Sequence, residues 1–183
     1  MTLERYMVMR QAVWAAGFRE EYEWANNIKP PETAVELFCE YSWVVINAGM
    51  KEQIARKIWK KVKDAIINGW EMSSVFGHEG KVKAIEEGWR HQQKRFELFK
   101  QAEMSGTILE FCESLPYIGK ITKYHLAKNL GAQVAKPDRW LERVAKQSGE
   151  TVQDLCERLA KESGDRITAV DNTIWRMCNL GLW

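Results

Sequence analysis

The segment Leu115–Thr122 combines residue types that suit the binding of an anion. Pro116 ends the helix before it, because the proline ring clashes with a helix interior, and Gly119 allows a tight turn before the next helix. The amide groups that open this next helix then face outward, and an exposed helix N-terminus attracts anions. Lys120 and Lys123 add positive charge at the same point. A backbone phosphate of a nucleic acid can bind at such a turn through main-chain amides, without contacts between side chains and bases.

A carboxylate follows further along the chain. Lys136-Pro137-Asp138 is a sound helix start, because aspartate is a preferred N-cap residue, and Asp138 lies 19 residues after Gly119. The surrounding chain is basic: residues 113–146 hold seven Lys or Arg against three Asp or Glu. A local excess of positive charge, rather than the net charge of the whole chain, is what an acidic partner recognises.

These residues resemble the helix-hairpin-helix of the HhH-GPD DNA glycosylase superfamily, whose pattern is Leu-Pro-Gly-hydrophobic-Gly, an apolar helix and a later aspartate. Leu115-Pro116-Tyr117-Ile118-Gly119 follows this pattern except at Tyr117, which replaces the first glycine. The likeness covers residues 115–143. It implies an all-α fold in a single domain over residues 1–183, with two helical lobes, a cleft between them and a helix-hairpin-helix at about 107–131.

The resemblance also implies an activity. A DNA N-glycosylase flips a damaged or modified base out of double-stranded DNA and hydrolyses its N-glycosidic bond, the first step of base excision repair. Breaking that bond develops positive charge on the deoxyribose, which a fixed carboxylate stabilises while it orients a water molecule. By position this carboxylate is Asp138. Asp171 is the competing candidate, and helix capping is the non-catalytic role open to each.

A second feature of the resemblance concerns strand cleavage. Superfamily members that also cut the DNA backbone carry a lysine two residues after the second hairpin glycine, where it forms a Schiff base with the sugar. Ile121 stands at that position, and Lys120 and Lys123 point elsewhere on a helix. We therefore expect a monofunctional enzyme without lyase activity.

The resemblance further assigns binding residues. Gly119, Lys120, Ile121 and Lys123 are expected to contact DNA phosphates. The segment Leu37–Met50 is similar to the early helix of the 3-methyladenine DNA glycosylase I branch, although the acid used there in base recognition is missing at Val44. A flipped base needs an aromatic or apolar slot, and a wedge must fill the gap it leaves. Candidates for the base pocket or wedge are Trp24, Trp43, Asn47, Met50 and Trp140.

Helices must position these residues, because the hydrophobic periodicity of the sequence is helical throughout. Val35, Phe38, Tyr41 and Val45 form one apolar stripe, and residues 152–160 form another. No segment alternates with the period of two that a strand requires. Helices are predicted at roughly 3–18, 33–46, 51–67, 81–103, 107–113, 120–130, 138–146, 152–160 and 171–178.

Composition excludes several classes of protein. Nine Trp and 45% hydrophobic residues supply a packed core, which excludes a disordered chain. The longest stretch without a charge, Tyr41–Met50, has ten residues, too few for a membrane-spanning helix. Charges at Glu4 and Arg5 argue against a secretory signal. We expect a monomer in the cytoplasm or at the nucleoid, with double-stranded DNA as partner and no membrane association.

The cysteines give no sign of a metal centre, since Cys39, Cys112, Cys156 and Cys178 lack the paired spacing of zinc or iron-sulfur ligands. We expect them to lie in the core. No metal or other cofactor is expected, although the carbonyls of the hairpin turn could hold a monovalent cation.

Two other functions fit the same sequence. One is a non-catalytic helix-hairpin-helix module that binds DNA without excising a base, and the other is an unrelated helical interaction protein. The basic run Lys51–Lys63 is either a solvated helix face or a further contact surface. The target base also stays open among alkylated purines, oxidised purines and elaborated pyrimidines, because residues of a base pocket come from distant segments.

Overall fold

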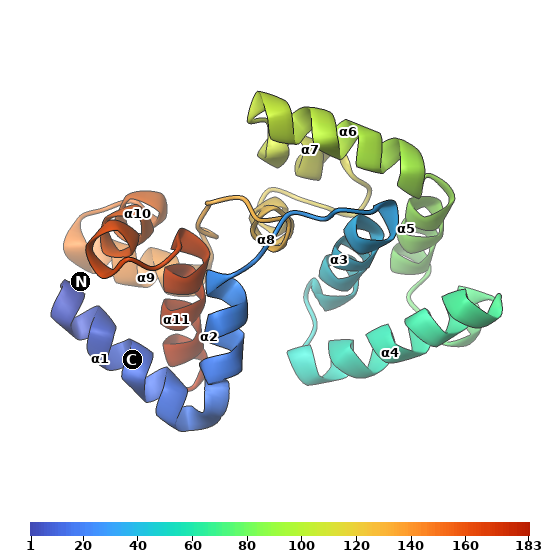
Figure 1. The fold of residues 1–183 in the computed structure, drawn as a ribbon. Helices are drawn as coiled ribbons and strands as arrows, with labels where there is room; N and C mark the ends of the chain where they lie inside the picture. Colours follow the sequence, from blue (N-terminus) through green and yellow to red (C-terminus); the bar gives the residue numbers. More distant parts are fainter. The chain divides into compact units, whose positions relative to one another are not determined.

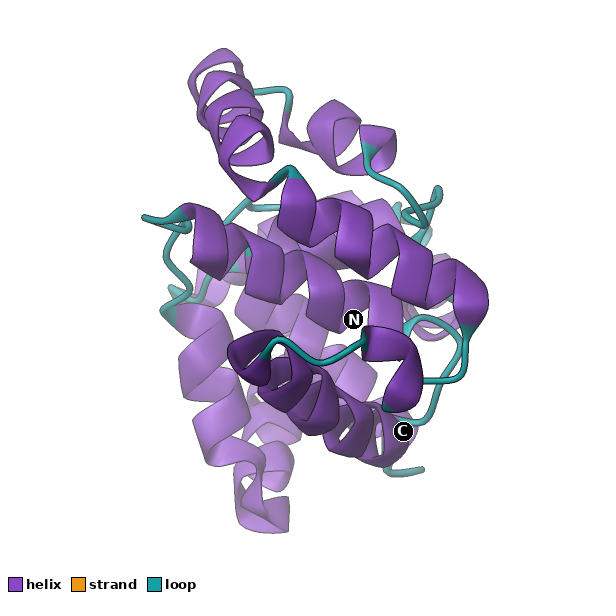
Figure 2. Ribbon diagram, turned by 90° about the vertical axis from the view of Figure 1, so that its right-hand side faces the viewer, coloured by secondary structure: helices purple, strands orange, loops and turns teal.

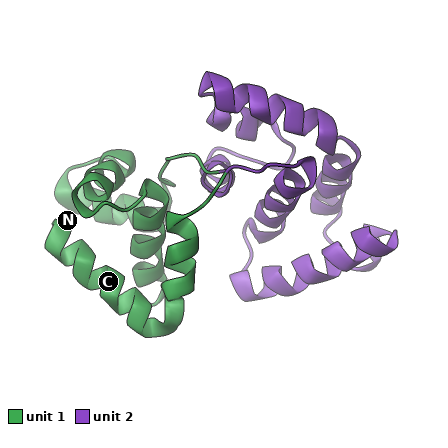
Figure 3. Cartoon of the chain, in the orientation of Figure 1, with its two compact units in different colours: residues 1–29, 131–183 green, residues 30–130 purple.

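The computed structural model describes residues 1–183, which form α-helices, one π-helical turn and one 3₁₀ turn without any strand (Figures 1 and 2). The prediction of an all-α fold is confirmed. The chain forms two compact units (Figure 3). Unit 1 contains residues 1–29 and 131–183, and unit 2 contains residues 30–130. Unit 2 is therefore an uninterrupted segment inserted between the two halves of unit 1.

Unit 1 is organised around its last helix. It consists of α1 (Leu3–Val13), the π-helical turn η1 (Trp14–Phe18), α2 (Arg19–Asn26), α9 (Arg139–Ser148), α10 (Val152–Ser163) and α11 (Ile167–Asn179). Helix α11 packs against α1, α2, α9 and α10. Its buried residues, among them Val170 and Ile174, join a core with Tyr6, Leu141 and Leu155. The last helix can bury so many residues because helices cover it on several sides.

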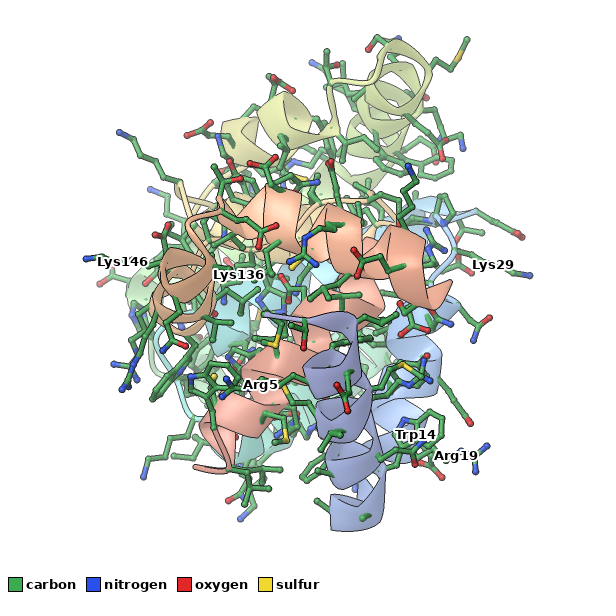
Figure 4. The ribbon with its side chains drawn as sticks, turned by 90° about the vertical axis from the view of Figure 1, so that its left-hand side faces the viewer. Arg5, Trp14, Arg19, Lys29, Lys136 and Lys146 are labelled. Atoms are coloured by element: carbon green, nitrogen blue, oxygen red, sulfur yellow. The ribbon has the colours of Figure 1, made fainter.

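The N-terminal pair of helices is joined by a kink rather than a loop. Gly17 takes φ +89° inside η1, a conformation that side chains disfavour, and this turns the chain from α1 into α2. Arg19 lies beside the Trp14 ring, 5.1 Å from its centroid, and the two are labelled together in Figure 4. The prediction of one helix over 3–18 therefore describes α1 and η1, and α2 was not predicted.

A buried carboxylate ties the first helices of unit 1 to its C-terminal half. Asp165, whose side chain is 5% exposed, accepts hydrogen bonds from the Tyr6 hydroxyl at 2.5 Å and the Tyr22 hydroxyl at 2.6 Å. The Arg10 guanidinium forms an ion pair with it at 3.0 Å. Burial, reinforced by the hydrogen bond to Asp165, raises the pKa of Tyr22 to about 12. Both tyrosines therefore remain hydroxyl donors to this carboxylate.

Unit 2 is organised around α3. It consists of α3 (Ala34–Asn47), α4 (Glu52–Asn68), the 3₁₀ turn η2 (Met72–Ser74), α5 (Glu79–Arg90), α6 (Gln92–Ser105), α7 (Ile108–Ser114) and α8 (Thr122–Asn129). A capping box of Thr33 and Glu36 starts α3. Helix α3 packs against α4, α5, α6 and α8. Its inward residues include Leu37, Phe38, Tyr41, Val44, Val45 and Ile46.

Two predicted helices of the chain have different bounds in the structure. The segment 81–103, predicted as one helix, is divided between α5 and α6 at His91, whose φ of −111° and ψ of 17° leave the helical region. Helix α11 begins at Ile167, four residues before the predicted start at Asp171.

None of the helices has both the length and the apolar composition that crossing a bilayer would require. Cys112, Cys156 and Cys178 are buried thiols as expected, whereas Cys39 is half-buried.

Candidate functional site

The turn between α7 and α8 has a defined geometry. The amide of Ile118 donates to the carbonyl of Leu115 at 3.1 Å, which closes a four-residue turn with Pro116 and Tyr117 at its centre. Tyr117 has φ +67°, and it is the one residue other than glycine with a positive φ in the chain. Proline followed by a residue with positive φ is typical of a type II turn, in which glycine normally takes the second position. Tyr117 thus adopts a backbone conformation that glycine normally takes.

A left-handed conformation costs a residue other than glycine about 1–2 kcal/mol, so surrounding contacts must hold Tyr117 in place. The N-terminus of α5 provides them. The Tyr117 hydroxyl lies 3.2 Å from Nε2 of His78, and the two rings meet edge to face. Nζ of Lys81 lies 5.7 Å from the centroid of the Tyr117 ring. These side-chain contacts hold the Tyr117 backbone in a conformation that a glycine would adopt without them.

The start of α8 leaves several amide groups accessible. Residues Gly119, Lys120 and Ile121 are exposed. The first helical bond of α8 runs from the amide of Lys123 to the carbonyl of Gly119 at 2.9 Å, so the amides of Lys120, Ile121 and Thr122 lie before the helical hydrogen bonds begin. The amide of Gly119 donates instead to Oγ1 of Thr122 at 2.7 Å. Among the residues predicted to bind phosphate, Lys120 and Ile121 therefore have backbone amides available to an anion. The Gly119 amide is already bonded to the Thr122 side chain.

The two lysines predicted to contact phosphates differ in their surroundings. Lys120 is exposed at the turn. Lys123 forms an ion pair with Glu113 of α7 at 2.6 Å, and its side chain is 19% exposed. The hydrogen bond to Glu113 raises the pKa of Lys123. Because Glu113 neutralises Lys123, Lys120 is the stronger phosphate candidate, and Lys123 links α8 to α7.

The predicted wedge region lies at the junction of α3 and α4. Asn47 is the last residue of α3, its carbonyl accepts the amide of Met50 at 3.0 Å, and both residues are half-buried. Trp43, also half-buried, lies one turn earlier, with the Arg56 guanidinium 5.6 Å from its ring centroid. The structure thus places three of the predicted pocket or wedge residues within one short segment of unit 2.

Lys81 connects this junction to the hairpin turn, and sequence reasoning missed it. Its ammonium donates to the carbonyls of Ile46 at 2.8 Å and Ala48 at 2.6 Å, while it lies beside the Tyr117 ring. Burial lowers the pKa of Lys81. The signal was present in the sequence, since Lys81 lies four residues before the buried Ile85 and therefore on the inward face of α5.

The candidate catalytic carboxylate belongs to unit 1. Oδ1 of Asp138 accepts the amides of Trp140 at 2.9 Å and Leu141 at 3.3 Å, which makes Asp138 the N-cap of α9. Oδ2 lies 3.7 Å from Nζ of Lys136, and the side chain is 14% exposed. Lys136 is labelled on the face of unit 1 that Figure 4 presents. One oxygen of Asp138 is thus fixed by the backbone, and the other lies beside a lysine of the same loop.

Asp171 has a different role from the one expected. It lies inside α11, not at a helix start, so the helix-capping role expected for it is wrong. Its Oδ2 accepts the amide of Lys136 at 2.5 Å, and the residue is 1% exposed. Asp171 therefore anchors the loop that leads to Asp138.

The two remaining pocket candidates also lie in unit 1. Trp24 of α2 is 48% exposed. Trp140 follows Asp138 in the first turn of α9, is partly buried against the core of the unit and has the Arg139 guanidinium 4.9 Å from its ring centroid. The predicted site residues thus form two groups. Unit 2 holds the hairpin with Trp43, Asn47 and Met50, and unit 1 holds Asp138 with Trp24 and Trp140.

Comparisons with protein-family models, curated proteins and solved structures gave no match to this chain. The structure contains no group of three or more His, Cys, Asp or Glu side chains placed to bind a metal ion.

Proposed function

We propose that this chain binds double-stranded DNA through the turn between α7 and α8 and acts as a DNA N-glycosylase without lyase activity. The observation that carries the proposal is the left-handed conformation of Tyr117. It supports a hairpin of the expected geometry, since a type II turn requires a positive φ at this position. Strained residues of this kind cluster at functional sites. The exposed amides after the turn then provide an anion site at the start of α8.

The proposed chemistry rests on Asp138. Two backbone amides fix its Oδ1, so the carboxylate keeps its orientation without reorganisation during the reaction. Oδ2 would stabilise the positive charge that develops on the deoxyribose and orient the attacking water. The non-catalytic alternative is a DNA-binding module, and the same two hydrogen bonds favour it, because capping alone explains them.

A lesion screen separates these two functions. Duplexes that each carry one alkylated purine, oxidised purine or modified pyrimidine are incubated with the protein and then treated with alkali. The glycosylase produces an abasic site, and hence an alkali-labile break, in at least one duplex. The module binds the duplexes and produces no break in any of them.

Replacing Lys120 with glutamate should weaken DNA binding for all sequences alike, because a phosphate contact carries no sequence information. The plot of log K against log salt concentration has a negative slope, and each lost phosphate contact reduces the magnitude of that slope by about 0.9. Fluorescence anisotropy with several duplexes over a range of KCl concentrations measures both quantities. Lys94→Glu is the matched control, since Lys94 is an exposed lysine on α6 of the same unit. If the two variants have the same DNA affinity and the same salt slope, the hairpin turn is not part of the DNA-binding surface.

Borohydride should trap no covalent complex between the protein and a cleaved lesion duplex. Ile121 has no amine to form an imine, and the buried ammonium of Lys81 is held by two carbonyls. Strand breaks should therefore require alkali or heat. Denaturing gel electrophoresis after borohydride treatment tests this, with a glycosylase of known lyase activity as positive control. An efficiently trapped adduct would show that another amine acts as the nucleophile.

A further inference from the structure

Helix α4 has one buried face and one strongly basic face. Ala55, Val62 and Ala65 are buried, and the helix packs against α3 and η2. The opposite face is exposed to solvent and carries five cations, Arg56, Lys57, Lys60, Lys61 and Lys63. The helix contains only two acids, Glu52 and Asp64, and Glu52 pairs with Arg56. The exposed half of α4 therefore has an excess of three positive charges, to which Lys51 adds one.

The distribution of apolar residues on α4 shows which polyanion suits this face. A helix that binds a membrane surface inserts a free apolar face between the lipids. The apolar stripe of α4 is already buried within unit 2. The exposed apolar residues, Ile54, Ile67 and Trp70, lie near the two ends of the segment and form no stripe between the cations. Charge complementarity without an apolar face fits the phosphate backbone of a nucleic acid.

The segment that leads into α4 and the hairpin turn share one neighbour, Lys81. Its ammonium donates to the carbonyls of Ile46, in the last turn of α3, and Ala48, four residues before α4, and lies 5.7 Å from the centroid of the Tyr117 ring in the turn. Both elements belong to unit 2. Seventeen residues at 1.5 Å each make α4 about 25 Å long. Double-stranded DNA carries one charge per about 1.7 Å of its axis, so many phosphates lie within the reach of such a helix.

From these observations we infer that the basic face of α4 (Arg56, Lys57, Lys60, Lys61 and Lys63) is a second, sequence-independent contact surface for double-stranded DNA. This inference rests on the proposed function in one respect, since that function supplies double-stranded DNA as the partner. The basic face adds affinity and salt dependence. It adds no discrimination between sequences, since lysine contacts to phosphates carry none.

The test compares two double variants of the full chain. Lys57→Gln with Lys60→Gln removes two charges from the basic face, and Lys94→Gln with Lys100→Gln removes two from exposed positions on α6. Binding to a duplex of random sequence is followed by anisotropy at several KCl concentrations. The α4 variant should reduce the magnitude of the salt slope by about 2 and weaken binding at low salt by about ten- to 100-fold, since two phosphate contacts are lost. The α6 variant should bind as wild type does.

Lys120→Glu, measured in parallel, separates the inference from the proposed function. If Lys120→Glu weakens binding and the α4 variant does not, the inference is wrong and the hairpin proposal stands. If the α4 variant alone weakens binding, the inference stands and the hairpin role fails. Wild-type protein that does not bind the duplex overturns both. Vesicles of phosphatidylcholine with phosphatidylserine complete the test: binding to them that needs Lys57 and Lys60, without binding to DNA, overturns the assignment of the partner.

Discussion

Asp138→Asn should slow base excision by about 100-fold or more, because it removes the negative charge that stabilises the developing sugar cation. Asparagine is as good an N-cap as aspartate, so α9 should keep its start and the protein should fold. DNA affinity should hold or rise slightly, since a carboxylate near phosphates is mildly repulsive. The measurement is single-turnover excision on the lesion that the screen identifies, with circular dichroism to confirm folding.

Two further variants make this result specific. Asp138→Ser preserves the cap with a different side chain and should lose as much activity as asparagine does. Glu142→Gln removes a carboxylate from an exposed position one turn along the same helix, and it should excise at close to the wild-type rate. Normal excision by both Asp138 variants would leave Asp138 with its capping role alone and favour the non-catalytic module.

Asp165→Ala should destabilise unit 1 by about 3–5 kcal/mol, the range found when one partner of a buried ion pair is removed. The substitution leaves the Arg10 guanidinium uncompensated and takes the acceptor from the hydroxyls of Tyr6 and Tyr22. All three groups are then poorly solvated and without their acceptor. Urea unfolding followed by circular dichroism measures the loss, and the transition of unit 1 should move to lower urea concentration.

An exposed ion pair provides the control. Glu23→Ala breaks the ion pair between Glu23, whose side chain is 51% exposed, and Arg19, whose side chain is 66% exposed. The free energy of unfolding should change by about 0.5 kcal/mol or less. Equal effects of the two substitutions would mean that the Asp165 cluster contributes no more than a surface pair does.

The sequence predicted the fold class because local signals agree with the tertiary structure along most of the chain. Thr33 starts α3 as expected, and Phe38, Tyr41 and Val45 are buried. Val35, predicted to share their stripe, is instead 51% exposed, and Leu37 is the buried residue one turn before Tyr41. The break at His91 was not predicted, because no proline interrupts the helical pattern there and Gly88, three residues earlier, lies inside α5. Helix α2 was missed because η1 carries the chain into it without a loop.

Only the part of the candidate site that lies in a short sequence motif could be predicted from the sequence. Leu115–Gly119 indicated the turn, and the identity of Tyr117 did not reveal that its backbone would adopt a glycine-like conformation. That depends on His78 and Lys81, residues nearly forty positions away, which pack against the ring. The pairing of Lys123 with Glu113 and the burial of Asp171 likewise depend on neighbours in space. Periodicity places a residue on a helix face but does not identify its partner.

The insertion of unit 2 between the two halves of unit 1 determines the order in which the chain can fold as it leaves the ribosome. Residues 30–130 emerge as one segment that contains all of unit 2. The apolar face of α1, with Tyr6, Met9 and Val13, has no partner until α10 and α11 are synthesised. At 5–20 residues per second, the roughly 170 residues from the end of α1 to the end of α11 leave that apolar face without its partners for roughly 8–33 seconds. During synthesis, the first helices of the chain are therefore the ones exposed to aggregation and to chaperones.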